Sequence, residues 1–244
     1  MHEVKRAIIM AAGTGTRMRP LTYRVPKPLI KVNGMRMIDT VIRGLHRNGI
    51  YEIYVVIGYL KEQFGCLVKE YPGVRLIENP WYDTCNNISS LYVAREYLED
   101  AIILDGDQII YHDSILNTSF NRSGYNCIWT KKWTDEWLLT VEKGVVTRCS
   151  RSGGENGWQL FSVSRWTAED GRKLKAHLEL EFEKKRNTQI YWDDVALFCH
   201  PEEYELGIFE MQPGDIVEID SLEELVQIDT TYRDVMKEKQ YAEE

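Results

Sequence analysis

Two hydrophobic periods alternate along the first hundred residues, and this alternation constrains the fold more than any other feature. Apolar runs, interrupted only by Arg75, predict strands at 7–12, 53–57, 74–77 and 101–104. One-sided apolar patterns predict helices between them, at 37–48, 61–71 and 89–98. This β-α-β order implies right-handed crossovers, so the strands run parallel and helices cover both faces. The predicted fold class is therefore α/β, a Rossmann-like and mainly parallel sheet.

The second half of the chain has shorter strand-like runs, separated by Gly, Asn and Asp, at 125–130, 137–141, 145–148 and 160–164. They predict a small antiparallel lid or insertion beside the parallel sheet. A charged helix is expected at 167–186, and a last strand at 216–219 precedes a helix that opens with the capping-box pair Ser221 and Glu224. Because no linker or repeat separates these parts, we expect a single domain over 1–244, with about 125–200 as the lid.

Composition and charge exclude few functions. The formal charge of −8 argues against a nucleic-acid scaffold, which usually carries a basic surface. No window is long and apolar enough for a membrane span, and the N-terminus lacks the layout of a secretory signal. The five cysteines are scattered without a CxxC pair. We therefore expect a reduced, cytoplasmic protein without a zinc site.

A glycine-rich segment, Gly13-Thr14-Gly15-Thr16-Arg17, directly follows the first strand. Glycines let the backbone turn sharply and present N–H groups to phosphate oxygens, while hydroxyls and a guanidinium add further donors. The candidate nucleotide-binding residues are Ala12, Gly13, Thr14, Gly15 and Thr16, and a plain tight turn is the alternative. The spacing matches neither GxxxxGK[ST] nor GxGxxG, which argues against a P-loop NTPase or a dinucleotide site.

The segment continues into a longer string, Arg19-Pro20-Leu21-Thr22 and then Val25-Pro26-Lys27-Pro28-Leu29. Prolines on both sides of Lys27 stiffen the backbone and fix where its ammonium points. Here the sequence resembles the sugar-phosphate nucleotidyltransferase superfamily, whose signature reads approximately GxGxRxxPLTxxxPKPL. The resemblance implies that Lys27 meets the α-phosphate and the incoming phosphate, and that Arg17 holds the β- and γ-phosphates. Without this string, Lys27 would be interpreted as a solvated loop lysine.

Three carboxylates near strand ends are candidate ligands of Mg²⁺. Asp107 lies just past the fourth strand, and Glu218 and Asp220 alternate in the last strand, so their side chains point to one face. Mg²⁺ takes a few carboxylates plus phosphate oxygens. The resemblance likewise implies an aspartate after this strand and a second acidic position near the chain end. Asp105 competes with Asp107 but is expected to form the turn, and an exposed strand carboxylate is the alternative for Glu218.

Seven tryptophans are many for this length, and several lie in polar, loop-like settings. Two clusters combine rings with carboxylates: Thr134-Asp135-Glu136-Trp137 and Tyr191-Trp192-Asp193-Asp194. Such clusters suit a quaternary ammonium, which donates no hydrogen bonds and is held by cation–π attraction. The alternative is that the rings anchor the core of the lid.

Over nearly its whole length the chain resembles bacterial CTP:phosphocholine cytidylyltransferases of the LicC type. The likeness rests on 58–64, Asn86-Asn87, Ser90-Leu91-Tyr92, Glu136-Trp137, Tyr191-Trp192-Asp193 and 218–221. In that family an aromatic and acidic pocket holds choline, which implies Trp137, Tyr191, Trp192 and Asp194 as acceptor-binding residues. Asp105-Gly106-Asp107 and a longer 153–157 loop depart from the family's form, so other acceptors stay open. Asn87 and Ser89 are candidate contacts of the base or ordinary helix caps.

The expected activity is that of a Mg²⁺-dependent nucleotidyltransferase that transfers CMP from CTP to phosphocholine and releases pyrophosphate. The same chemistry on phosphoethanolamine, 2-aminoethylphosphonate or a sugar 1-phosphate is the first alternative. A non-catalytic regulatory homologue that binds nucleotide is the alternative of another class, and the presence of Lys27, Arg17 and Asp107 argues against it. The expected partners are small-molecule substrates, with no nucleic acid and no membrane insertion; a homo-oligomer stays open.

Overall fold

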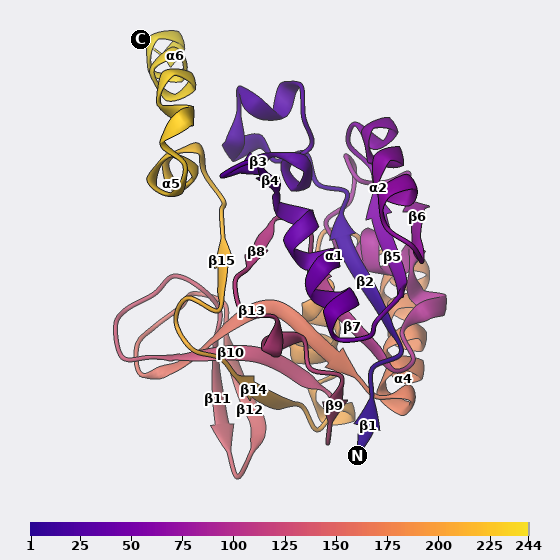
Figure 1. The fold of residues 1–244 in the computed structure, drawn as a ribbon. Coiled ribbons are helices and arrows are strands. Elements are labelled where there is room, and N and C mark those ends of the chain that lie inside the picture. The colour runs from indigo at the N-terminus through magenta and orange to yellow at the C-terminus, as the bar shows by residue number, and fades with distance from the viewer. Residues whose placement is uncertain (244) are drawn as a thin grey trace.

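A nine-stranded sheet forms the centre of the protein in the computed structural model, which describes residues 1–243 (Figure 1). Its strands are β2 (Arg6–Ala11), β5 (Glu52–Ile57), β6 (Val74–Glu78), β7 (Ala101–Asp105), β10 (Gly124–Thr130), β11 (Leu138–Glu142), β12 (Val145–Ser150), β13 (Gly157–Trp166) and β14 (Gly207–Glu210). Strands β7, β2, β5 and β6 are adjacent and parallel, as the alternating pattern predicts. Strand β13 adds to β7 in the antiparallel sense and pairs with β10 and β11. The α/β class with a small antiparallel addition is confirmed.

Helices cover both faces of the sheet. They are α1 (Met37–Arg47), α2 (Gly65–Glu70), α3 (Ile88–Val93) and α4 (Ala168–Leu178), whereas α5 (Leu222–Ile228) and α6 (Arg233–Glu243) pack in a separate hydrophobic core. Successive residues of β2 point to opposite faces, so Ile9 packs in one core with α1 and α2, and Ile8 in another with α3 and α4. This two-sided burial explains the continuous apolar runs of β2, β5 and β7. Among residues 1–243, no helix is long and apolar enough to cross a membrane.

Three pairs of short strands lie outside the main sheet: β1 (His2–Glu3) with β9 (Ser119–Phe120), β3 (Lys31–Val32) with β4 (Met35–Arg36), and β8 (Gln108–Ile110) with β15 (Ile216–Glu218). The last pair positions the site, because β8 directly follows the turn after β7 and β15 lies antiparallel to it. A third core, which includes Met18, Ile219 and Leu222, packs the segment after β15 against the glycine-rich loop region. The chain end therefore meets the N-terminal loop, and α5 lies close to it in Figure 1.

Three predicted helices are shorter than their apolar patterns. The helix expected at 61–71 is a 3₁₀ turn, Lys61–Phe64, followed by α2. In place of the helix expected at 89–98 the structure has the shorter α3. Arg95 Nη1 donates to the carbonyl of Tyr92 near the end of α3 and satisfies a helix-end acceptor. The one expected at 167–186 is α4 followed by a π-helical segment, Glu179–Lys184. The capping box of Ser221 and Glu224 is present at the start of α5, as predicted.

Candidate active site

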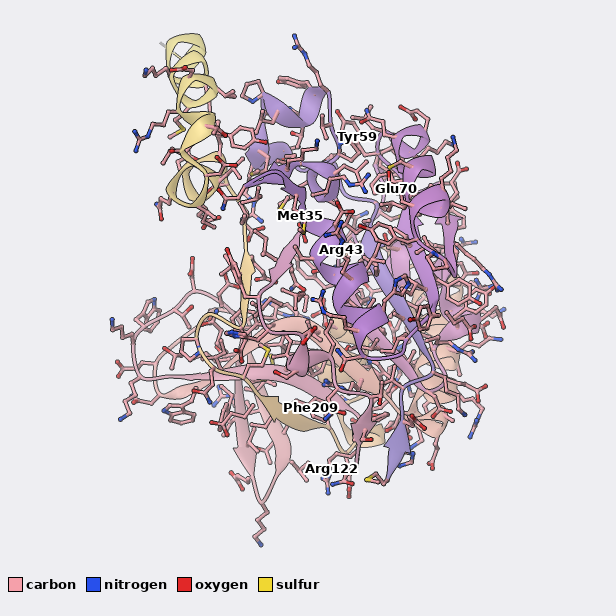
Figure 2. The ribbon with its side chains drawn as sticks, in the orientation of Figure 1. Met35, Arg43, Tyr59, Glu70, Arg122 and Phe209 are labelled. Atoms are coloured by element: carbon pink, nitrogen blue, oxygen red, sulfur yellow. The ribbon has the colours of Figure 1, made fainter. Side chains whose placement is uncertain are left out.

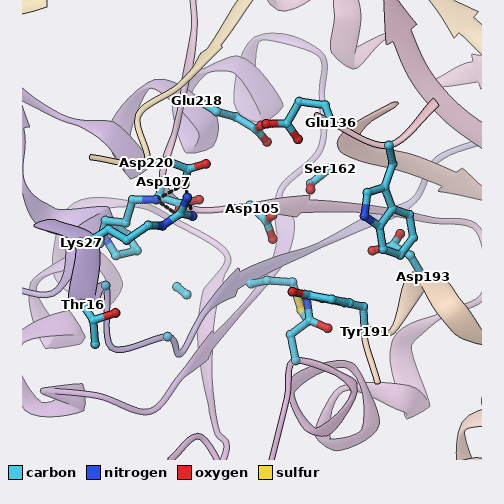
Figure 3. Close-up of a pocket in the computed structure, with 18 of the residues that line it drawn as sticks. Thr16, Lys27, Asp105, Asp107, Glu136, Ser162, Tyr191, Asp193, Glu218 and Asp220 are labelled. Atoms are coloured by element: carbon cyan, nitrogen blue, oxygen red, sulfur yellow. Dashed lines mark hydrogen bonds and ion pairs between the residues drawn. The ribbon is translucent and has the colours of Figure 1, made fainter. Parts of the chain in front are cut away.

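A cavity of about 470 Å³ opens at the carboxyl ends of β2 and β7, the edge where parallel α/β sheets bind ligands (Figure 3). Its lining carries six carboxyl groups and only two cationic side chains. The predicted site residues that line it are Gly13, Gly15, Thr16, Arg17, Lys27, Asn87, Asp107, Trp137, Tyr191, Glu218 and Asp220. The predicted residues outside the lining are Ala12, Thr14, Ser89, Trp192 and Asp194.

The glycine-rich loop is folded tightly onto the segment that carries Lys27. Gly15 has a φ of +60°, and a Cβ at this position would lie 3.0 Å from carbons of both Lys27 and Thr22. The hydroxyl of Thr22 donates to the carbonyl of Gly15 at 2.9 Å. Tyr59, which lies beside this loop in Figure 2, donates to the carbonyl of Thr22 at 2.8 Å. Glycine is therefore required at position 15 by conformation and by space.

Lys27 is the buried cation of the cavity, with 8% of its surface exposed. Its Nζ lies 2.6 Å from Asp107 Oδ2 and 2.8 Å from Asp220 Oδ1. Burial opposes the charge, but the two carboxylates outweigh it and raise the pKa of Lys27. Arg17 joins the cluster with its Nη2 3.0 Å from Asp220 Oδ1. The two predicted phosphate-binding cations thus converge at one end of the cavity (Figure 3).

Asp105 lies inside the cavity, which corrects the expectation that it forms the turn. It is the last residue of β7, in register with Met10 of β2. Because Ile103 and Met10 belong to the core under α3 and α4, the alternation of β7 turns Asp105 to that same side of the sheet. Burial raises the pKa of Asp105 well above its ordinary value, and nearby Asp107 and Glu218 raise it further.

The predicted metal carboxylates share one side of the cavity. Asp107 and Asp220 both contact Lys27, while Glu218 Oε1 accepts from Gln108 Nε2 at 2.6 Å. Burial raises the pKa of Glu218 to about 7 against the hydrogen bond from Gln108, and Asp107 and Asp220 add to the rise. Within residues 1–243, no three His, Cys, Asp or Glu side chains are arranged as ligands of one metal ion.

Aromatic and acidic side chains meet at the other end of the cavity, where Figure 3 shows Tyr191 and Asp193. Trp137 and Tyr191 pack edge to face, with ring centroids 5.7 Å apart. Asp193 lines the cavity, and burial raises its pKa to about 7. The buried hydroxyl of Tyr125 approaches this carboxyl and opposes the rise of its pKa. This end therefore combines two rings with one buried carboxyl.

Trp192 and Asp194 do not line this pocket, contrary to prediction. Trp192 is 2% exposed and packs against Trp166 and Tyr125 in the core. Asp194 is also buried, where it pairs with Arg151 and accepts from the backbone N–H of Tyr191. Burial of the large apolar ring of Trp192 is favourable. The turn at 191–194 therefore directs Tyr191 and Asp193 to the cavity instead.

Asn87 and Ser89 have different surroundings. Asn87 lines the cavity, and its Oδ1 accepts from the backbone N–H of Trp192 at 2.8 Å instead of capping α3. Ser89 is fully buried, donates to the carbonyl of Asn86 and accepts from Asn79. Ser89 thus holds the start of α3 together from the interior and does not face the cavity.

Four polar cavity residues lie outside the predicted site: Asp105, Glu136, Ser162 and Asp193. Ser162 could have been found, because it is a polar residue at an alternate position of an apolar strand, between the buried Phe161 and Val163. Glu136 and Asp193 were both inside the ring-and-carboxylate clusters that the sequence singles out. No sequence signal separates Asp193 from Asp194, since only the turn at 191–194 decides which one faces the cavity.

Comparison with known proteins places the chain among enzymes. Residues 6–118, which include the glycine-rich loop and Asp107, match the family described as nucleotidyl transferase. A 2-aminoethylphosphonate cytidylyltransferase of Lancefieldella rimae is 39% identical over 236 residues, which cover 94% of this chain and 94% of that protein. A choline-phosphate cytidylyltransferase of Streptococcus pneumoniae is 33% identical, over 90% of this chain and 94% of that protein.

A solved structure agrees with these relatives. The CTP:phosphocholine cytidylyltransferase from Streptococcus pneumoniae, LicC, superposes with a TM-score of 0.87 at 33% identity, and the match covers 94% of this chain and 99% of that one. The fold and the family resemblance expected from the sequence are thereby confirmed.

Proposed function

We propose that this chain, which belongs to the nucleotidyltransferase family and to its cytidylyltransferases, transfers CMP from CTP to the phosphonate or phosphate group of a small amine. We rank 2-aminoethylphosphonate first and phosphocholine second. The observation that carries this order is Asp193, a buried carboxyl that lines the cavity at the same end as Trp137 and Tyr191. A primary ammonium donates hydrogen bonds to such a group, and a quaternary ammonium does not.

The cationic end of the cavity supports the triphosphate half of this proposal. Gly13, Gly15 and Thr16 line it together with Lys27 and Arg17. In the structure the charge of Lys27 is balanced by Asp107 and Asp220, and phosphate oxygens are natural competitors for the same ammonium. CTP bound here has its α-phosphorus near Lys27, between the loop and the acceptor end.

We further propose that Mg²⁺ binds beside this loop, held by Asp107 and Asp220 with Glu218 behind them. The donor set fits the ion, because six cavity carboxyls face only two cations, and the negative charges of Asp107 and Asp220 add to the rise that burial causes in the pKa of Glu218. Two carboxylates suffice when phosphate oxygens and water complete the shell. When bound, the ion supplies neutralisation of charge on the phosphates.

The reaction is a substitution at the α-phosphorus of CTP. An oxygen of the acceptor's phosphonate forms a bond to that phosphorus as its bond to the bridging oxygen of the β-phosphate breaks, and pyrophosphate leaves with the electron pair. The acceptor oxygen is already an anion, so no general base is required. Lys27 and Arg17 bring the two anions together and balance the charge that spreads over the phosphate oxygens.

The acceptor's amine is then expected at the end with Trp137, Tyr191 and Asp193. The relative that is 39% identical is named for a primary amine, 2-aminoethylphosphonate, which agrees with the carboxyl of Asp193 in the lining of this end of the cavity. Phosphocholine remains the second candidate for a specific reason: the edge-to-face pair of Trp137 and Tyr191 offers ring surface for cation–π attraction. The Streptococcus pneumoniae relative is named for choline phosphate.

Acceptors that differ only in N-methylation test this order. Pyrophosphate release with CTP is measured for 2-aminoethylphosphonate against its trimethylammonium analogue, and for phosphoethanolamine against phosphocholine. We expect kcat/KM to be at least about tenfold higher for the primary amine of each pair, since a trimethylated head leaves Asp193 unpaired. A preference for the trimethylated member of both pairs would make phosphocholine the acceptor instead. No release with any of the four would overturn the proposed function.

A further inference from the structure

Arg151 joins the two parts of the chain that build the acceptor end, although it does not line the cavity. It lies directly after β12, on the antiparallel addition, and its Nη2 is 2.5 Å from Asp194 Oδ1. The Asp194 side chain is 3% exposed, whereas that of Arg151 is 47% exposed. A surface guanidinium thus reaches inward to balance a buried carboxylate.

The ion pair of Arg151 with Asp194 is connected to the cavity through the backbone of the turn at 191–194. Asp194 Oδ2 accepts from the N–H of Tyr191 at 2.9 Å, and the N–H of Asp194 donates to the carbonyl of Tyr191 at 3.1 Å. These two hydrogen bonds, both between Tyr191 and Asp194, close the turn that carries Asp193. Fixing Asp194 therefore fixes the positions from which Tyr191 and Asp193 face the cavity.

The same guanidinium also packs on aromatic rings. Its Cζ lies 3.9 Å from the ring centroid of Phe198 and 5.6 Å from that of Trp137. Trp137 in turn packs edge to face with both Phe198 and Tyr191, at 5.7 Å in each case. One planar cation thus holds the ring of Trp137, which directly precedes β11, against the segment that follows the turn at 191–194.

We propose that Arg151 is the positioning residue of the acceptor pocket, and that through Asp194 and Trp137 it sets how tightly the enzyme holds the acceptor's amine. This inference rests on the proposed function. It concerns the acceptor alone, because the loop with Lys27 and Arg17 lies at the opposite end of the cavity and makes none of the contacts of Arg151 described above.

Two variants of Arg151 separate its charge from its shape. Arg151→Met removes both, and leaves Asp194 as a buried carboxylate without its counter-ion. Arg151→Lys keeps the charge but lacks the planar group that packs on Phe198 and Trp137. Arg148→Met is the matched control, since Arg148 is an exposed arginine of the same strand, β12.

Steady-state pyrophosphate release, with CTP and 2-aminoethylphosphonate varied in turn, provides the readout. For Arg151→Met we expect the acceptor KM to rise by about tenfold or more while the CTP KM stays within about twofold. Arg151→Lys should fall between this variant and the wild type, and Arg148→Met should match the wild type. Acceptor-induced stabilisation in thermal unfolding, measured with CTP absent, should shrink in the same order and does not depend on turnover.

A merely structural role would lower thermal stability and raise both KM values together, and that result would overturn the inference. So would an unchanged acceptor KM in a folded Arg151→Met protein. If Arg151→Met does not fold, Arg151→Lys decides by the same split between the two KM values. Failure of the proposed function and failure of the role of Arg151 give different results. Absence of turnover by the wild type with every small amine rejects the proposed function. Wild-type turnover with an unaffected variant rejects only the role of Arg151.

Discussion

Lys27 and Asp107 form an ion pair in which Nζ lies 2.6 Å from Oδ2, and this pair joins the loop after β2 to the turn after β7. Asp220, from the chain end after β15, completes the cluster at 2.8 Å. Three segments far apart in the sequence thus converge on one ammonium. These ion pairs hold the three segments together around Lys27 at the cationic end of the cavity.

Replacement of Lys27 tests the role of this cluster in turnover. We expect Lys27→Met to lower kcat/KM by about 10²–10³-fold, since one aimed cation at the α-phosphate is lost. Lys31→Met, at an exposed lysine of the same segment, serves as the control and should keep normal kinetics. Pyrophosphate release measures both. Wild-type rates in Lys27→Met would contradict the assignment of this residue to the reacting phosphate.

Replacement of Asp107 tests the magnesium proposal. Asp107→Asn should abolish most turnover at the Mg²⁺ concentration that saturates the wild type, and should raise the concentration needed for half-maximal rate, because a carboxylate ligand becomes a neutral amide. Titration of the metal-free protein with MgCl₂ measures this shift. Asp83→Asn, at an exposed aspartate, is the control. An unchanged Mg²⁺ requirement in Asp107→Asn would reject Asp107 as a ligand.

Replacement of Trp137 tests where the amine binds. Trp137→Ala should raise the acceptor KM by about tenfold and leave the CTP KM nearly unchanged, because its ring packs on Tyr191, which lies away from Lys27 in Figure 3. The trimethylated acceptor should lose more than the primary amine, since it depends on ring contact alone. Trp133→Ala, at a ring 71% exposed, is the control. Equal effects on both substrates would contradict the location of the acceptor pocket.

The buried carboxyl of Asp193 predicts a pH dependence with two signs. Its pKa is raised from 3.8 to about 7 mainly by burial, so the folded protein holds this proton more tightly than the unfolded chain. Its contribution to stability is therefore full below about pH 4 and falls as pH rises through 7. Asp193→Asn should be more stable than the wild type at pH 8, as measured by urea unfolding, and should equal it near pH 4.

Amine binding should show the opposite trend, because the ionised carboxylate is the better partner for an ammonium. The kcat/KM for 2-aminoethylphosphonate should rise as pH passes through about 7, with a smaller change for CTP. Asp193→Asn should lack this rise and bind the acceptor weakly at every pH. Tyr125, Cys149, Asp105 and Asp194 also approach this carboxyl, and their variants should move its titration without removing it. A wild-type profile in Asp193→Asn would contradict the role given to Asp193.

The sequence predicts the fold and the phosphate end of the cavity better than the acceptor end. Hydrophobic period identifies the parallel strands, and a contiguous string of residues carries the loop with Lys27 and Arg17. Local patterns of this kind can be interpreted from the sequence because they depend on residues that are close together in the chain. Asp107 and Asp220 follow from strand ends and alternation in the same way.

The acceptor end could not be resolved because it depends on contacts between distant segments. Trp192 and Asp194 stand beside Tyr191 and Asp193 in the sequence, yet the turn directs the first two into the core and the last two into the cavity. Burial of the Trp192 ring decides this geometry, and the rings that it packs against, Trp166 and Tyr125, lie in β13 and β10. Arg151 carries no motif at all, and its role depends on a pairing 43 residues along the chain.

The central claim, that this cavity attaches CMP to a small aminated phosphonate or phosphate, is tested most directly by pyrophosphate release over four ribonucleoside triphosphates and a set of acceptors, with product masses determined. We predict that CTP with 2-aminoethylphosphonate gives the highest kcat/KM and a product that contains CMP and the acceptor in equal amounts. Preferred turnover of another nucleotide, or of a sugar 1-phosphate, would contradict the account.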